Sequence, residues 1–332
     1  MNMINDSANI TLSVNGATKN ETVGGKPMMT QPGLKAAVIG LGSMGLGMAQ
    51  CMAKGGIDVF GFDLNPQAMK ALAEVGGTAA KSAADAAHDC QVLVSVVVNA
   101  TQTRMVLFGE HGAAAHMQRG GVIISCATMA PEQARGLAKD AEALGLYYLD
   151  APMSGGAVKA AAGQLTFMAS GSAAAFAVAQ PVLDLVAGKV YQLGAAAGAG
   201  AAFKMVNQLL AGVHIAAACE AMTFAAKLGL DLDKVYEVIT ASAGNSWMFE
   251  NRVPHILEGD YSPRSAISIF TKDLGIISDM SRQEKFPVQM ASTALQMFLA
   301  TAAAGMDADD DASVARMIAK ISGLELPHLH KS

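Results

Sequence analysis

Lys204 stands in a strongly apolar stretch, residues 198–229, with Asn207 and Gln208 as close polar neighbours. Spacings of three and four residues place these three side chains on one face of a helix. If that face is buried, loss of water disfavours the ammonium and lowers the pKa of the lysine, which makes it a general base near neutral pH. The alternative is a lysine whose stem follows the helix surface until its charged end reaches water. This segment alone leaves both interpretations open.

A glycine motif, residues 40–45, follows an apolar run and opens a helical segment. In a dinucleotide-binding turn the first glycine permits the tight turn, the second lets the backbone approach a pyrophosphate, and the third lets helix and strand pack closely. The helix N-terminus adds donors for the anion. A plain strand-to-helix turn is the competing interpretation. The cofactor-binding residues that the motif predicts are Gly40, Leu41, Gly42, Ser43, Met44 and Gly45.

Asp63 ends the second apolar run, 23 residues after Gly40. A carboxylate at about this separation accepts the ribose hydroxyls of a dinucleotide and repels a 2′-phosphate. The sequence therefore predicts NAD, in preference to NADP, as the cofactor. Asp63 can also begin an Asx turn that includes Asn65 and Pro66, and the two roles are compatible.

A third motif, residues 150–156, follows another apolar run and contains Ser154, Gly155 and Gly156. Open α/β sheets bind ligands at the carboxyl ends of their strands. Successive glycine N–H groups and a serine hydroxyl suit an anion such as a carboxylate, although an ordinary glycine turn is the alternative. Residues 125–128 end another predicted strand at the same edge, which predicts that Thr128 lies near the nicotinamide end of the cofactor.

The elements that position these residues alternate between strands and helices. Strands are predicted at residues 35–39, 58–62, 92–98, 121–125 and 146–150, and helices at 43–54, 66–75, 101–107 and 131–144. A strand at 165–169, a helix at 173–186 and a strand at 189–193 are predicted to extend the same sheet. After the Gly-rich and Ala-rich segment 194–202 only helices are predicted, interrupted at Pro254, Pro263 and Pro287.

This pattern predicts an α/β fold in which a Rossmann-type, doubly wound parallel sheet is followed by an all-α domain. The long helix that carries Lys204 joins the two. The predicted divisions are a flexible tail at 1–34, an NAD-binding domain at 35–197, and an all-helical domain for substrate binding and oligomerisation at 198–332. A chain of 332 residues is long enough for two such cores.

The overall charge of −5 gives no electrostatic reason to bind nucleic acid or an anionic membrane. Four cysteines without paired spacing predict neither a zinc site nor a disulfide framework, and favour a reducing, cytoplasmic location. The apolar stretch 201–219 approaches transmembrane length, but it contains Lys204, Asn207, Gln208 and His214, which favours a buried helix of a soluble protein.

An acidic segment, residues 307–311, resembles a metal-binding loop only superficially. It lacks the glycine and the terminal glutamate of a calcium loop. We interpret its aspartates as a solvated helix start, and no metal is predicted.

The order of four segments is similar to that of the β-hydroxyacid dehydrogenases, the 3-hydroxyisobutyrate dehydrogenase-like family. These are residues 40–45, residues 150–156 with 163–166 after them, Lys204 with Asn207, and residues 272–274. The resemblance covers about residues 35–325 and implies an NAD-dependent dehydrogenase of a small hydroxy acid. Residues 153–159 and 244–249 most resemble the branch of the family that acts on four-carbon sugar acids.

The resemblance also implies roles for individual residues. Lys204 matches the family's catalytic lysine, and Asn207 matches its partner in holding the substrate. Lys272 matches a lysine near cofactor and substrate, with Asp273 beside it. The substrate carboxylate site matches Ser154, Gly155 and Gly156.

Two positions depart from the family pattern. Gln208 stands where asparagine is usual, which leaves its role open. Ser125 or Cys126 replaces an aspartate that is frequent there, which affects cofactor contacts more than chemistry.

The implied reaction is oxidation at the 2-hydroxyl to a 2-oxo acid, with Lys204 taking the hydroxyl proton. Trp247 is a further candidate for the wall of the substrate pocket, although an aromatic between helices is more often a core residue. Alternatives are reduction of tartronate semialdehyde, oxidation of 3-hydroxyisobutyrate, and a non-catalytic NAD-binding sensor. An imine reductase is disfavoured by Lys204. The apolar helical domain predicts a homodimer or homotetramer.

Overall fold

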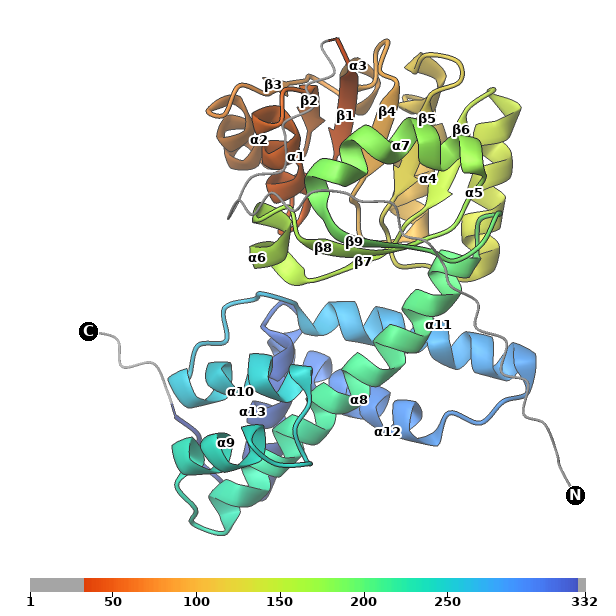
Figure 1. Cartoon of the computed structure of the whole chain (residues 1–332). Helices are drawn as coiled ribbons and strands as arrows, with labels where there is room; N and C mark the ends of the chain where they lie inside the picture. Colours follow the sequence, from red (N-terminus) through yellow and green to blue (C-terminus); the bar gives the residue numbers. More distant parts are fainter. Residues whose placement is uncertain (1–32, 328–332) are drawn as a thin grey trace, which may run out of the picture. The chain divides into compact units, whose positions relative to one another are not determined.

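The computed structural model describes residues 33–327, so the predicted tail lies outside the described residues except for Gly33 and Leu34. Its larger sheet is parallel, with the strand order β3-β2-β1-β4-β5-β6 (Figure 1). The strands are β1 (Lys35–Ile39), β2 (Asp58–Phe62), β3 (Thr78–Ala79), β4 (Val92–Ser95), β5 (Val122–Ser125) and β6 (Tyr147–Asp150). This order is that of a doubly wound Rossmann sheet, as predicted. The short strand β3 was not predicted from the sequence.

Helices cover both faces of this sheet. They are α1 (Gly45–Lys54), α2 (Pro66–Ala73), α3 (Ala83–Ala86), α4 (Ala100–Phe108), α5 (Pro131–Ala143) and α7 (Ala173–Val186). Alternate residues of β1 divide between two cores: Ala36 and Val38 pack with α1, α2 and α7, whereas Ala37 and Ile39 pack with α3, α4 and α5. A parallel strand buried on both faces is expected to be continuously apolar, which explains the run that predicted β1.

The prediction that later strands extend this sheet is wrong. Strands β7 (Met153–Ser154), β8 (Leu165–Ala169) and β9 (Ala187–Gln192) form a separate sheet, with α6 (Gly156–Ala161) between β7 and β8. Pro152 has no N–H for a ladder, and its carbonyl accepts a hydrogen bond from the Met168 N–H (2.9 Å). The chain therefore leaves the first sheet after Asp150 and pairs within the second.

The remaining elements are helical: α8 (Ala199–Lys227), α9 (Leu232–Thr240), α10 (Trp247–Glu258), α11 (Ile267–Glu284), α12 (Gln289–Thr301) and α13 (Val314–Ser322). Figure 1 shows α8 as the long helix against which the others pack, and it contacts α10, α11, α12 and α13. By length and composition α8 is apolar enough to cross a membrane. Its Met205, Ile215 and Met222 belong to the core of this helical region, so α8 serves as a core helix.

The predicted break at Pro254 is wrong, whereas Pro263 and Pro287 do lie between helices. Pro254 lies inside α10 and cannot donate to the carbonyl of Glu250, four residues earlier. The Tyr236 hydroxyl donates to that carbonyl instead (3.1 Å), which satisfies the acceptor that proline leaves free.

The predicted solvated helix start at residues 307–311 is wrong for its last two aspartates. Asp310 and Asp311 are fully buried. Arg252 pairs with Asp311 (2.6 Å) and His255 with Asp310 (2.7 Å), so α10 supplies cationic or donor partners that make this burial tolerable. Within residues 33–327, no cluster of three or more His, Cys, Asp or Glu side chains is arranged to hold a metal ion.

Candidate active site

Lys204 is buried, with 7% of its surface exposed. Its Nζ donates a hydrogen bond to the Met153 carbonyl oxygen at 2.8 Å. Burial lowers the pKa of Lys204 to about 8, while the Asp273 charge raises it and the Lys272 charge lowers it further. The structure therefore places the lysine away from water, as one of the two interpretations of the sequence predicted, with a pKa suited to proton transfer.

Four side chains link α8 to α11 and to the loop that follows β5. Asn207 Nδ2 donates to Gln208 Oε1 (2.9 Å), and Gln208 Nε2 donates to Asp273 Oδ2 (2.6 Å). Lys272 pairs with the other oxygen of Asp273. The Lys272 amine also lies 3.4 Å from the Thr128 carbonyl oxygen. Two predicted site residues, Asn207 and Lys272, are thus joined through Gln208, whose role the sequence left open.

The start of α8 is fastened to the end of β6 by Asp150. The N–H groups of Gly198 and Ala201 each donate to Asp150 Oδ2 at 2.9 Å, and the Ser170 hydroxyl donates to the same atom at 3.2 Å. A Cβ on Gly200 would lie 2.3 Å from the Met168 carbonyl oxygen, so only glycine permits this approach. Burial raises the pKa of Asp150, and the Ala201 and Gly198 N–H groups oppose that shift. Asp150 thereby fixes the helix that carries Lys204.

The serine–glycine turn directly follows the residue that Lys204 contacts. Ser154 is half-buried in β7, next to Met153. Gly155 and Gly156 have φ angles of +139° and +71°, a region that favours glycine. The predicted carboxylate site and the predicted base are therefore neighbours.

The dinucleotide turn has the geometry that its three glycines predict. A Cβ on Gly40 would lie 2.8 Å from the Val96 carbonyl oxygen, and one on Gly45 would lie 1.9 Å from the Gly40 carbonyl oxygen. Gly42 instead faces open space, with no atom within 4 Å of such a Cβ. The tight turn, the close packing and the accessible backbone together fit a pyrophosphate at the start of α1.

Asp63 holds this turn from the end of β2. Its Oδ2 accepts from the Leu41 N–H (2.6 Å), and its Oδ1 accepts from the Asn65 N–H (2.8 Å), the predicted Asx turn. Each carboxylate oxygen keeps a further lone pair for a ribose hydroxyl. The residue thus fits both roles that the sequence suggested.

Trp247 begins α10 and is 54% exposed, whereas its neighbour Phe249 is a core residue. No hydrogen bond within the described chain joins the Trp247 ring to the residues around Lys204. Its role in the substrate pocket stays a prediction.

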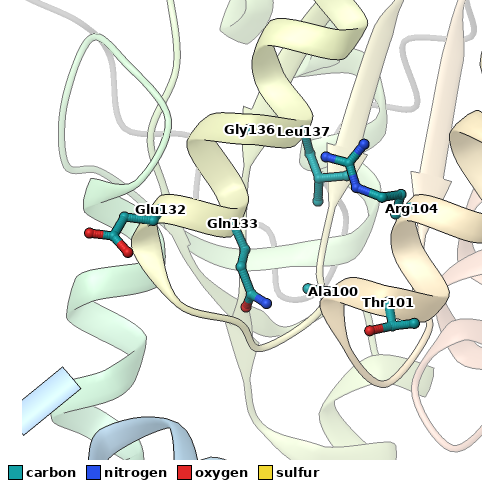
Figure 2. A pocket seen from close by; sticks show the side chains of 7 residues that line it. All are labelled: Ala100, Thr101, Arg104, Glu132, Gln133, Gly136 and Leu137. Atoms are coloured by element: carbon teal, nitrogen blue, oxygen red, sulfur yellow. The ribbon is translucent and has the colours of Figure 1, made fainter. Parts of the chain in front are cut away.

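A separate depression of about 370 Å³ lies between α4 and α5 (Figure 2). Its lining residues are Ala100, Thr101, Arg104, Glu132, Gln133, Gly136 and Leu137. Arg104 is paired with Asp140 at 2.6 Å and is therefore engaged on the protein surface. None of the predicted site residues lines this depression, so it is distinct from the candidate active site.

The dinucleotide turn, the acid at the end of β2 and the buried lysine beside a serine–glycine turn define an NAD-dependent hydroxyacid dehydrogenase. Two family models match the chain. Residues 35–194 match the NAD binding domain of 6-phosphogluconate dehydrogenase. Residues 198–318 match the NAD-binding domain of NADP-dependent 3-hydroxyisobutyrate dehydrogenase. The chain belongs to the 3-hydroxyisobutyrate dehydrogenase-like family of β-hydroxyacid dehydrogenases.

Two curated relatives are similar over most of their length. L-threonate dehydrogenase of Cupriavidus necator is 51% identical over 290 residues, which cover 87% of this chain and 97% of that protein. L-threonate dehydrogenase of Haemophilus influenzae is 48% identical over 300 residues, which cover 90% and 99%. A crystal structure of 3-hydroxyisobutyrate dehydrogenase from Salmonella typhimurium is 49% identical, covers 86% of this chain and 99% of that one, and has a TM-score of 0.83.

Proposed function

We propose that this enzyme oxidises L-threonate at its 2-hydroxyl to the 2-oxo acid, 2-dehydro-L-erythronate, with NAD as the oxidant. The observation that carries the proposal is the buried Lys204 amine, which lies 2.8 Å from the carbonyl oxygen of Met153, the residue directly before Ser154. Lys204 and the Ser154 turn together offer a base and an anion-binding site that are close enough for one small hydroxy acid to contact both. The names of the relatives from C. necator and H. influenzae support L-threonate as that acid.

The carboxylate of the substrate binds the Ser154 hydroxyl and the N–H groups of Gly155 and Gly156, which fixes the carbon to be oxidised. Neutral Lys204 keeps one N–H on the Met153 oxygen, and its lone pair takes the proton of the 2-hydroxyl. The chemistry that bound NAD would supply is acceptance of the hydride from the same carbon, so that loss of the proton to Lys204 and of the hydride would leave a carbonyl. Lys204 then releases its proton to solvent.

The cofactor is held by the turn at residues 40–45, with Asp63 at the ribose. Thr128 follows β5, and the amine of Lys272 on α11 lies 3.4 Å from its carbonyl oxygen, which supports a place for both residues at the nicotinamide half of the cofactor. Asn207 orients the substrate one helical turn beyond Lys204. We propose that Trp247, exposed at the start of α10, forms part of the wall of the substrate pocket.

A second candidate is the oxidation of 3-hydroxyisobutyrate, which the name of the Salmonella typhimurium structure favours. Reduction of tartronate semialdehyde is compatible with the same residues. A non-catalytic NAD sensor has no use for a lysine whose pKa is lowered to about 8 beside an anion-binding turn.

The test is steady-state NADH formation with L-threonate, D-threonate, the two erythronates and 3-hydroxyisobutyrate, each with NAD and with NADP. We expect the highest kcat/KM for L-threonate with NAD. Higher kcat/KM for 3-hydroxyisobutyrate would replace the proposed substrate. NAD binding without turnover of any acid would support the sensor.

We also infer a cytoplasmic homodimer or homotetramer. Phe203, Val206 and Leu210 form an exposed apolar stripe on α8, which a second subunit would cover. The four cysteines are free thiols, as in a reducing compartment. Light scattering of the purified protein tests the assembly: a monomer at micromolar concentration would contradict it.

A further inference from the structure

The side-chain amide of Asn207 donates a hydrogen bond through its NH₂ group, whereas its oxygen accepts none from the described residues. Its Nδ2 donates to Gln208 Oε1 at 2.9 Å. Within residues 33–327 no donor is paired with its Oδ1, and this atom reaches solvent. Three residues of helix place Asn207 about 4.5 Å beyond Lys204 along the axis of α8. The available acceptor therefore lies further along the helix than the proposed base, on the same face.

The orientation of this amide is dictated by Asp273. A carboxylate only accepts hydrogen bonds, and Asp273 is fully buried and paired with Lys272. The Gln208 end that faces it at 2.6 Å must therefore be the NH₂ group. The other end of Gln208 is then its oxygen, so Asn207 must offer its own NH₂ group to that oxygen. The carbonyl oxygen of Asn207 is consequently turned away from Gln208. We call Asp273, Gln208 and Asn207 the amide relay.

We propose that the amide relay makes the active site select acids that carry a hydroxyl on the carbon next to the one oxidised. The inference rests on the proposed function. With the carboxylate at the Ser154 turn and the reacting hydroxyl at Lys204, the rest of the substrate extends towards Asn207. The Asn207 oxygen accepts a hydrogen bond from the 3-hydroxyl, and Gln208 and Asp273 act as positioning residues that keep this oxygen there.

The substrate class is thus the 2,3-dihydroxy acids. An acid without a hydroxyl on carbon 3 displaces water from the Asn207 oxygen when it binds but offers that oxygen no hydrogen-bond donor. A site built to bind a hydroxyl discriminates against the analogue that lacks it. We expect a preference of about 10-fold or more in kcat/KM, which corresponds to one unsatisfied buried acceptor.

The test compares L-threonate with 2,4-dihydroxybutyrate of the same configuration at carbon 2, which lacks only the 3-hydroxyl. Gln208→Met keeps the volume of the side chain and breaks the relay. We expect the ratio of the two kcat/KM values to fall from about 10 or more towards 1, mainly through a higher KM for L-threonate. The affinity for NAD is unchanged. Gln283→Met, an exposed position on α11, is the matched control and keeps the wild-type ratio.

Gln208→Glu separates the relay from a merely structural role. Protonated, this side chain donates to Asp273 and accepts from Asn207, which restores the polarity of the relay. Ionised, it repels Asp273. Burial and that neighbouring charge both favour the protonated form, so its pKa is raised and the ratio is expected to recover near pH 6 and to fall as the pH rises.

A wild-type ratio near 1, or an unchanged ratio in Gln208→Met, overturns the inference. Either result leaves L-threonate turnover by the wild type intact, so the proposed function survives it. Absence of L-threonate turnover by the wild type removes the proposed function instead.

Discussion

Burial of Lys204 costs stability, and replacing it with methionine should stabilise the protein while removing activity. The pKa of Lys204 falls from 10.5 in water to about 8 in the folded protein. Each pKa unit corresponds to about 1.4 kcal/mol, so at pH 7 the buried ammonium costs about 3 kcal/mol. Methionine has a similar length and carries no charge, so the Lys204→Met variant avoids this cost.

The stability gained by Lys204→Met is partly offset by a lost hydrogen bond, and it decreases as the pH rises. The variant loses the hydrogen bond to the Met153 carbonyl oxygen, worth about 1 kcal/mol, so the net gain at pH 7 is about 2 kcal/mol. The folded lysine deprotonates above pH 8 while the unfolded one stays charged up to pH 10.5. The cost in the wild type therefore falls to about 2 kcal/mol at pH 9 and about 1 kcal/mol at pH 10, which makes the net gain vanish near pH 10.

The assay is urea unfolding of wild type and Lys204→Met at pH 7, 9 and 10, followed by circular dichroism. Lys139→Met, at an exposed position of α5, is the control and should change the unfolding free energy little at any of these pH values. Destabilisation of Lys204→Met at pH 7, or a gain that does not shrink between pH 7 and 10, would refute the account of a buried, desolvated amine.

Three further predictions follow from the site. The kcat/KM of L-threonate oxidation should rise about tenfold per pH unit below pH 8 and level off above it, because Lys204 must be neutral to act as the base. Lys272→Met should move the midpoint of this pH profile to higher pH, because a like charge beside Lys204 is lost. A pH-independent kcat/KM argues against Lys204 as the base. Asp150→Ala should lower the unfolding free energy by about 2 kcal/mol, since the N–H groups of Gly198, which precedes α8, and of Ala201, in its first turn, lose their acceptor; an unchanged urea midpoint contradicts this. Asp63→Ala should weaken NAD binding about tenfold and reduce the preference for NAD over NADP, both measured by calorimetry. An NAD affinity equal to that of the wild type contradicts the proposed contact between Asp63 and the ribose.

The sequence predicted those features whose physical causes are local. In the turn at residues 40–45, Gly40 has a positive φ angle of +93° and Gly45 lies against the Gly40 carbonyl oxygen, so both requirements for glycine arise within the motif itself. The alternation of apolar runs and helical segments likewise predicted the Rossmann sheet. The apolar stretch around Lys204 left open whether the lysine is buried or reaches water, and it was the order of the other motifs along the chain that favoured a catalytic lysine.

Features that depend on distant partners were missed or misplaced. Asp150 looked like part of an anion-binding motif, but its partners in α8 begin 48 residues later. Gln208 and Asp273 are 65 residues apart, so their coupling leaves no signal in either segment. Asp310 was predicted to be solvated because its partner His255 lies 55 residues away. The second sheet was missed because strand pairing, unlike strand formation, is not encoded in a local pattern.

The most direct test of the central claim is single-turnover NADH formation from L-threonate by Lys204→Met, at pH 8 and saturating NAD. A general base contributes about 10²- to 10⁴-fold, and the variant should lose that factor while its affinity for NAD stays within about twofold of wild type. Because the variant is expected to be the more stable protein at this pH, unfolding does not explain such a loss. A rate within about threefold of wild type would show that Lys204 is not the base.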